Sequence, residues 1–68
     1  MGVDRPLTLT VEQAGRALGV GRSMAYELVR SGEVEGLRLR RRMVVPVAPL
    51  ARRLGVSIDE LWRAIDPG

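Results

Sequence analysis

The sequence contains no cysteine, histidine, phenylalanine or lysine. Without cysteine, no disulfide bond can stabilise the 68-residue chain, and without histidine as well the usual zinc sites are excluded. Because the aromatic residues are limited to Tyr26 and Trp62, aliphatic side chains and methionine must fill the core. A chain of this length forms one small domain that buries only about 60% of its surface, so self-association is a second expected source of stability.

Long apolar segments are also missing. No apolar run approaches the roughly 20 residues of a membrane span, and the N-terminal sequence MGVDRP lacks the apolar centre of a signal peptide. We therefore expect a cytoplasmic protein with no membrane partner. Residues 1–6 are expected to form a flexible arm.

The residues that carry most enzyme chemistry are absent or scattered. There is no glycine-rich phosphate loop, and the carboxylates fall on predicted helix caps and exposed faces. Gly19 and Gly21 fit helix ends better than a nucleotide cradle. We therefore expect no enzyme, no catalytic residue, no cofactor and no metal site.

All of the positive charge is arginine: 11 arginines against 8 acidic residues give a net charge of +3. The planar guanidinium suits phosphates and guanine edges, and it also packs on apolar surface. The lack of lysine and asparagine fits a GC-rich coding bias equally well. Clustering is more informative, and four arginines lie close together at Arg38, Arg40, Arg41 and Arg42.

Residues 10–32 predict two short helices joined by a tight corner. Thr10 and Gln13 form a capping box at the start of the first helix, and Gly19 is placed to end it. The first helix has an apolar stripe at Val11, Ala14, Ala17 and Leu18.

The second helix is expected over residues 22–30, before Gly32. One face is predicted to be apolar, with Met24, Ala25, Leu28 and Val29, and the other polar, with Arg22, Ser23, Tyr26, Glu27 and Arg30. Small residues at Gly15 and Gly19 allow the helices to cross closely, as in a helix-turn-helix whose second helix enters the DNA major groove. The same spacing also fits an ordinary helical hairpin.

After Gly32 the pattern changes to the alternation of a β-hairpin. Residues 37–39 and 43–46 are the expected strands, with Leu37 and Leu39 facing the helices and Arg38 facing outward. The tip carries Arg40, Arg41 and Arg42, which repel one another unless negative charge lies beneath them. A solvated turn and a DNA-binding wing both fit this segment, and its place after a helix-turn-helix favours the wing.

Two more helices are expected beyond Pro46. The first covers residues 47–54, with Pro49 in its first turn, and Gly55 ends it. A capping box formed by Ser57 and Glu60 then starts a helix through Ile65. Its apolar face is Ile58, Leu61, Trp62 and Ile65. Trp62 either closes the core or anchors a second copy, and the lack of other large side chains favours the core.

Residues 7–54 resemble the excisionase-type helix-turn-helix family, relatives of the MerR DNA-binding domain. The matching positions are Leu9, Thr10, Glu12, Ala14, Leu18, Gly19, Val20, Arg22, Tyr26, Leu28, Ser31, Gly32, Arg38, Arg41, Arg42, Pro46 and Leu50. The resemblance implies a mainly α winged helix-turn-helix with a small β-hairpin. Residues 55–68 would then form a short helix that packs on this domain or mediates self-association.

The family resemblance also implies a function. It implies sequence-specific binding to double-stranded DNA, association with the nucleoid, and a role as an excisionase (a recombination directionality factor that bends DNA), with an integrase and further copies of the chain as partners. A small transcription regulator of the same fold is the first alternative. A protein–protein interaction module is the alternative from another class.

The expected DNA contacts come from helix 22–30 in the major groove and from the wing. Base edges or flanking phosphates are assigned to Arg22 and Ser23, a thymine methyl or phosphate to Tyr26, a cytosine amino group to Glu27, and backbone phosphates to Arg30, Arg38, Arg40, Arg41 and Arg42. Glu27 could instead hold Arg30 in place. This assignment requires Tyr26 and the arginines of the hairpin to lie on the same side of the molecule.

Three positions depart from the family pattern. Gly21 stands where a serine commonly caps the second helix, Arg40 replaces a glycine of the wing turn, and Val44 replaces a frequent arginine. A positive φ at Arg40 would be strained, because side chains other than glycine rarely adopt it.

Overall fold

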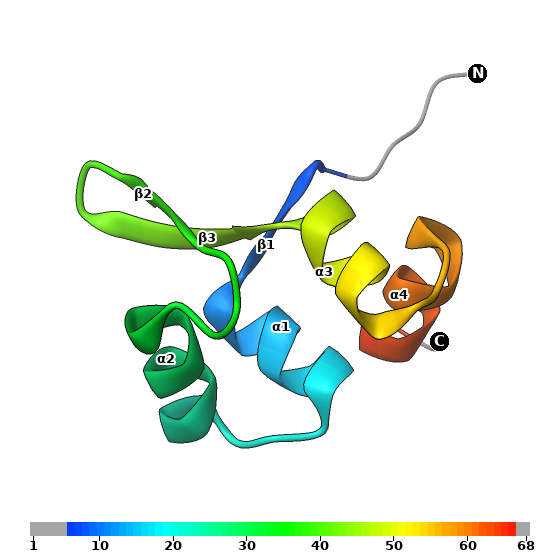
Figure 1. Ribbon diagram of the computed structural model, residues 1–68, viewed down its shortest axis with the longest axis horizontal. Coiled ribbons are helices and arrows are strands. Elements are labelled where there is room, and N and C mark those ends of the chain that lie inside the picture. The colour runs from blue at the N-terminus through cyan, green and yellow to red at the C-terminus, as the bar shows by residue number, and fades with distance from the viewer. Residues whose placement is uncertain (1–5, 67–68) are drawn as a thin grey trace.

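The computed structural model describes residues 6–66. In chain order the elements are β1 (Thr8–Thr10), α1 (Val11–Leu18), α2 (Arg22–Ser31), β2 (Leu37–Leu39), β3 (Arg42–Pro46), α3 (Val47–Leu54) and α4 (Ile58–Ile65). The β2–β3 hairpin projects from one end of the molecule, whereas α3 and α4 lie at the other (Figure 1). The mainly α class, the hairpin and all four helices were predicted. Of the arm expected over residues 1–6, only Pro6 lies within the described residues.

The sheet has three antiparallel strands in the order β1-β3-β2. Leu9 of β1 is paired with Val45 of β3, and both side chains are buried. The pairing of β1 with β3 was not predicted from the sequence. A three-residue strand is too short for alternation to show it, and its partner lies more than thirty residues further along the chain.

Both predicted capping boxes are present. At α1 the amide of Gln13 donates to the hydroxyl of Thr10 at 3.0 Å, and the amide of Thr10 donates to the side-chain carbonyl of Gln13 at 2.9 Å. At α4 the amide of Glu60 donates to the hydroxyl of Ser57, whose own amide donates to the Glu60 carboxylate at 2.8 Å. The hydrogen bonds from Ser57 lower the pKa of Glu60 from its ordinary value, because they favour the charged carboxylate.

The helix-turn-helix crossing depends on small residues, as the sequence predicted. A Cβ added at Gly15 of α1 would lie 3.0 Å from the Cβ of Ala25 in α2, so α1 and α2 approach too closely there for a larger side chain. Gly19 ends α1 in the left-handed conformation, with φ of 75°. The corner that follows brings α2 across α1 (Figure 1).

The buried faces of α2 and α4 are narrower than their predicted apolar faces. Met24 and Ile58 lie on the predicted apolar faces but are 52% and 47% exposed. On α2 only Ala25 and Val29 are buried.

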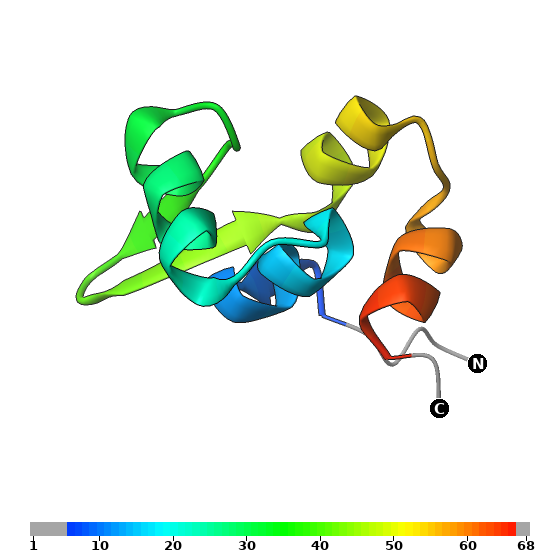
Figure 2. The ribbon, with the colours of Figure 1, turned by 90° about the horizontal axis from the view of Figure 1, so that it is seen from below.

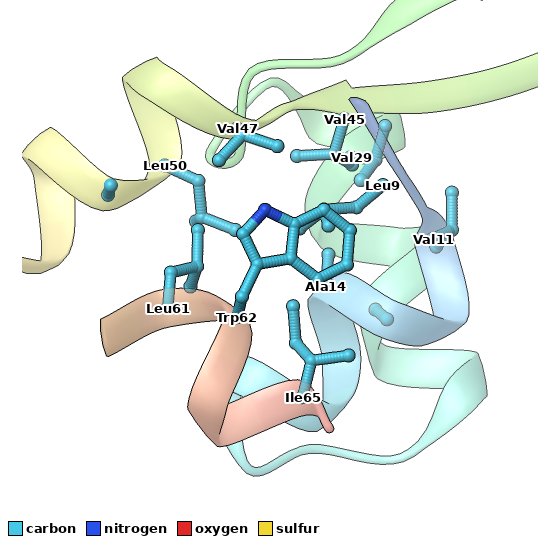
Figure 3. Packing of buried hydrophobic residues seen from close by; sticks show 12 residues of the cluster. Leu9, Val11, Ala14, Val29, Val45, Val47, Leu50, Leu61, Trp62 and Ile65 are labelled. Carbon is cyan, nitrogen blue, oxygen red and sulfur yellow. The ribbon is translucent and has the colours of Figure 1, made fainter. Parts of the chain in front are cut away.

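Trp62 lies at the centre of the core. Figure 3 shows its indole among the side chains of Val47, Leu50, Ala14 and Ile65. These residues come from α1, α3 and α4, so Trp62 joins the C-terminal helices to the helix-turn-helix. Of the two roles that the sequence left open for Trp62, the structure shows the core position, where it is 6% exposed.

Replacing Gly21 with serine is expected to stabilise the domain. Gly21 is the N-cap of α2 with φ of −75°, and a Cβ placed there meets nothing within 4 Å. A serine hydroxyl could accept from the amide of Met24, which adds a few tenths of a kcal/mol and raises the melting temperature by about 1–3 °C. Gly19→Ser is the matched control in the same corner, and its positive φ makes destabilisation the expected result. Equal shifts of the melting temperature in both variants would contradict this assignment.

Candidate nucleic-acid interface

The outer face of α2 carries a polar surface opposite its buried side. One shallow, open depression on this face is lined by Arg22, Ser23, Tyr26, Glu27 and Arg30. All five residues assigned to the second helix from the sequence are therefore brought together. Ala25 and Val29, which point into the core, fix the rotation of the helix that presents them.

A second depression lies between α2 and the hairpin. This cleft of about 200 Å³ is lined by Tyr26, Val29, Arg30, Arg38, Arg41, Arg42 and Met43. Four of these seven residues are arginines and none is acidic, so the cleft is strongly positive. Its charge suits a strand of nucleic-acid backbone better than an apolar ligand.

Tyr26 and Arg30 line both depressions, which therefore form one continuous surface. The expectation that Tyr26 and the hairpin arginines lie on one side of the molecule is confirmed. Figures 1 and 2 show α2 and the β2–β3 hairpin at the same end in both views, away from α3 and α4. Tyr26 packs partly against the core but keeps an exposed part.

The predicted orientation of β2 is wrong. Arg38 is paired with Met43, which packs against the core, so Arg38 faces the cleft beside α2. Leu37 and Leu39 point the other way and are 45% and 49% exposed. Alternation along a strand shows that Leu37 and Leu39 share a face, but the register with β3 decides which face it is.

Arg40 lies at the tip of the hairpin and lines neither depression. Its φ is +58°, which confirms that this turn requires the left-handed conformation. Its carbonyl accepts a hydrogen bond from Nε of Arg38 at 3.4 Å. The backbone of the turn therefore helps to hold Arg38 in place.

Arg40→Gly is expected to raise the stability of the domain by about 1 kcal/mol, because glycine adopts a positive φ without the clash of a Cβ. Urea unfolding followed by circular dichroism would measure the change. Arg41→Gly is the matched control. This substitution removes the same charge from the same turn, at a residue that does not have a positive φ. That control is expected to lose stability, and a gain of equal size in both variants would exclude backbone strain as the cause.

Glu12, which contacts a residue of this surface, was not predicted as part of the site. Its Oε2 lies 3.2 Å from Nε of Arg22, across the corner of the helix-turn-helix. A contact between Glu12 and Arg22 could not be predicted, because ten positions separate the two residues and no helical spacing joins them. Only the crossing of α1 and α2 brings the two side chains together.

These features define a DNA-binding domain of the helix-turn-helix class, and comparison with known proteins agrees. The chain belongs to the helix-turn-helix domain family, which matches residues 8–52. This finding confirms the resemblance stated from the sequence. Within residues 6–66, no helix is long and apolar enough to cross a membrane.

The chain is also similar to a protein of Saccharopolyspora erythraea named "probable excisionase". The two sequences are 50% identical over 38 residues, a segment that covers 56% of this chain and 39% of the relative. The chain therefore matches well under half the length of that protein. No solved structure gives a significant match.

Proposed function

We propose that this protein binds double-stranded DNA in a sequence-specific manner, with α2 in the major groove and the β2–β3 hairpin on the adjoining backbone and minor groove. The observation that carries the proposal is the surface shared by α2 and the hairpin through Tyr26 and Arg30. A helix that presents polar side chains beside an arginine-lined cleft offers base readout and phosphate binding together.

The positions of the side chains suggest how the contacts are divided. Arg22 and Ser23, in the first turn of α2, would reach base edges or the phosphates beside them. Tyr26 would contact a thymine methyl or a phosphate, and Glu27 would accept from a cytosine amino group or orient Arg30. Backbone phosphates would bind Arg30 and the hairpin residues Arg38, Arg41 and Arg42, with Arg40 reaching outward from the tip.

For the biological role we propose an excision factor that bends DNA. The support is the S. erythraea relative, which carries the name "probable excisionase" and shares half of the aligned residues. A transcription regulator would use the same surface, so the two roles differ in partners rather than in contacts. An integrase and further copies of this chain on adjacent DNA sites are the partners that an excision factor would need.

We further propose that residues 7–54 carry the DNA contacts and that residues 55–68 stabilise them. Every proposed contact lies in α2 or the hairpin, whereas Trp62 and Ile65 of α4 fill the core beneath. Helix α4 would then affect DNA binding only through the stability of the domain.

A gel-shift titration against random-sequence duplex DNA tests the proposal directly. We expect binding at low salt that weakens steeply as salt rises, because arginine–phosphate contacts release counterions. Binding to a duplex labelled at both ends, followed by energy transfer, would show the bend as a shortened end-to-end distance. The lack of any complex at low salt would favour a protein-interaction module instead.

A further inference from the structure

Arg22 is held from two sides at the start of α2. The carboxylate of Glu12, in the first turn of α1, lies 3.2 Å from its Nε atom. The guanidinium carbon of Arg22 lies 5.8 Å from the centre of the Tyr26 ring, within the range of a cation–π contact. The side chain is therefore oriented by one residue from each helix of the helix-turn-helix.

The ion pair involves one edge of the guanidinium. The Glu12 carboxylate approaches Nε, so the N–H groups at the far end of the guanidinium can be presented to DNA. That end has the geometry of the bidentate contact that arginine makes with O6 and N7 of guanine. Glu12 thus occupies the side of Arg22 that is not needed for reading a base.

The same pair contributes little to folding. The side chains of Arg22 and Glu12 are 71% and 43% exposed, and ion pairs in such positions add little net stability. The pair and the Tyr26 ring can still restrict the orientations of Arg22. A long side chain loses rotamer freedom when it binds, and a residue that holds it beforehand reduces that cost.

We propose that Glu12 is a positioning residue for DNA recognition, which holds Arg22 so that its guanidinium reads a guanine in the major groove. This inference rests on the proposed function. It assigns a specificity role to a carboxylate that, by charge alone, would only repel DNA.

Removing the Glu12 charge should therefore have two separable effects. Non-specific affinity should rise, because one negative charge near the phosphates is gone. Preference for guanine should fall, because Arg22 is no longer held in one orientation. A residue with a merely electrostatic or structural role would change overall affinity without changing base preference.

The test uses the full chain and a pool of 20-base-pair duplexes with random sequence. Selection with the unaltered protein gives a preferred duplex, and Arg22→Ala identifies the guanine that depends on Arg22. Affinity is then compared between this duplex and the same duplex with that G·C pair changed to A·T. We expect the unaltered protein to prefer guanine by at least about tenfold, and Arg22→Ala to lose that preference.

In the same assay, Glu12→Gln is expected to reduce the preference for guanine by about three- to tenfold. In the double variant Glu12→Gln/Arg22→Ala, the Glu12 change should have no further effect on it. Glu12→Asp keeps the charge but has a shorter side chain. This variant should lose preference for guanine without the rise in non-specific affinity that is expected for Glu12→Gln. Circular dichroism of each variant checks that it folds.

Asp59→Asn is the matched control. Asp59 also forms an exposed ion pair, with Arg63 at 3.9 Å on α4, so this variant removes the same charge far from the site. It should leave the guanine preference unchanged. The inference is overturned if Glu12→Gln and Glu12→Asp both keep the full preference for guanine. It is also overturned if Glu12→Gln lowers that preference equally in the Arg22→Ala background. In both cases the proposed function stands. If the unaltered protein enriches no sequence, the proposed function itself fails.

Discussion

Trp62→Ala is expected to unfold most of the protein at about 25 °C. The indole is 6% exposed and lies between α1, α3 and α4 (Figure 3). Truncation of a buried tryptophan to alanine costs about 3–5 kcal/mol. A small core without disulfide bonds or metal seldom supplies more than about that amount, so little stability remains.

Thermal and urea unfolding followed by circular dichroism would measure this loss. Leu54→Ala is the control, because Leu54 also belongs to the C-terminal half but is 39% exposed. Its expected cost is a fraction of the loss at Trp62. Similar midpoints for the two variants would show that α4 does not close the core.

The triple variant Arg38→Ala/Arg41→Ala/Arg42→Ala is expected to lose most DNA binding. These arginines line the cleft beside α2. If the protein neutralises about five phosphates, the slope of log K against log salt concentration is near −4 to −5. Loss of three of these contacts should make the slope less steep by about 2.7. At about 1 kcal/mol for each contact, affinity should fall on the order of 100-fold.

A control with the same change in charge separates the hairpin from net charge. Arg52→Ala/Arg53→Ala/Arg63→Ala removes three exposed arginines from α3 and α4, at the other end of the molecule (Figure 2). Gel-shift titrations across a salt series should give this control nearly the slope of the unaltered protein. Equal losses of DNA affinity in the two triple variants would mean that binding depends on the overall charge of the protein and not on the cleft.

The helices could be predicted closely because their signals are local. The capping residues Thr10 and Ser57, and the glycines at positions 19, 32 and 55, mark helix ends within a few residues of the segments they bound. The polar face of α2 followed from helical spacing alone, and the structure places its five predicted residues on one surface.

The features that could not be predicted depend on contacts between distant segments. The pairing of β1 with β3, the orientation of Arg38, and the contact of Glu12 with Arg22 are all fixed by tertiary structure. Alternation shows which residues share a face of a strand, but not which face packs against the helices. Leu37 and Leu39 were assigned to the wrong side because burial of leucine is a tendency that the register of a short hairpin can override.

The direct passage from β3 into α3 limits how the hairpin can move. The strand ends at Pro46 and the helix begins at Val47, so no linker separates them. The buried residues Val45 and Val47 lie on either side of this junction, and β1 pairs along the same stretch of β3. We therefore expect the base of the hairpin to be rigid where β3 passes into α3. If DNA binds as proposed, we expect the double helix rather than the hairpin base to deform where their shapes differ, so that affinity depends on the stiffness of the DNA sequence.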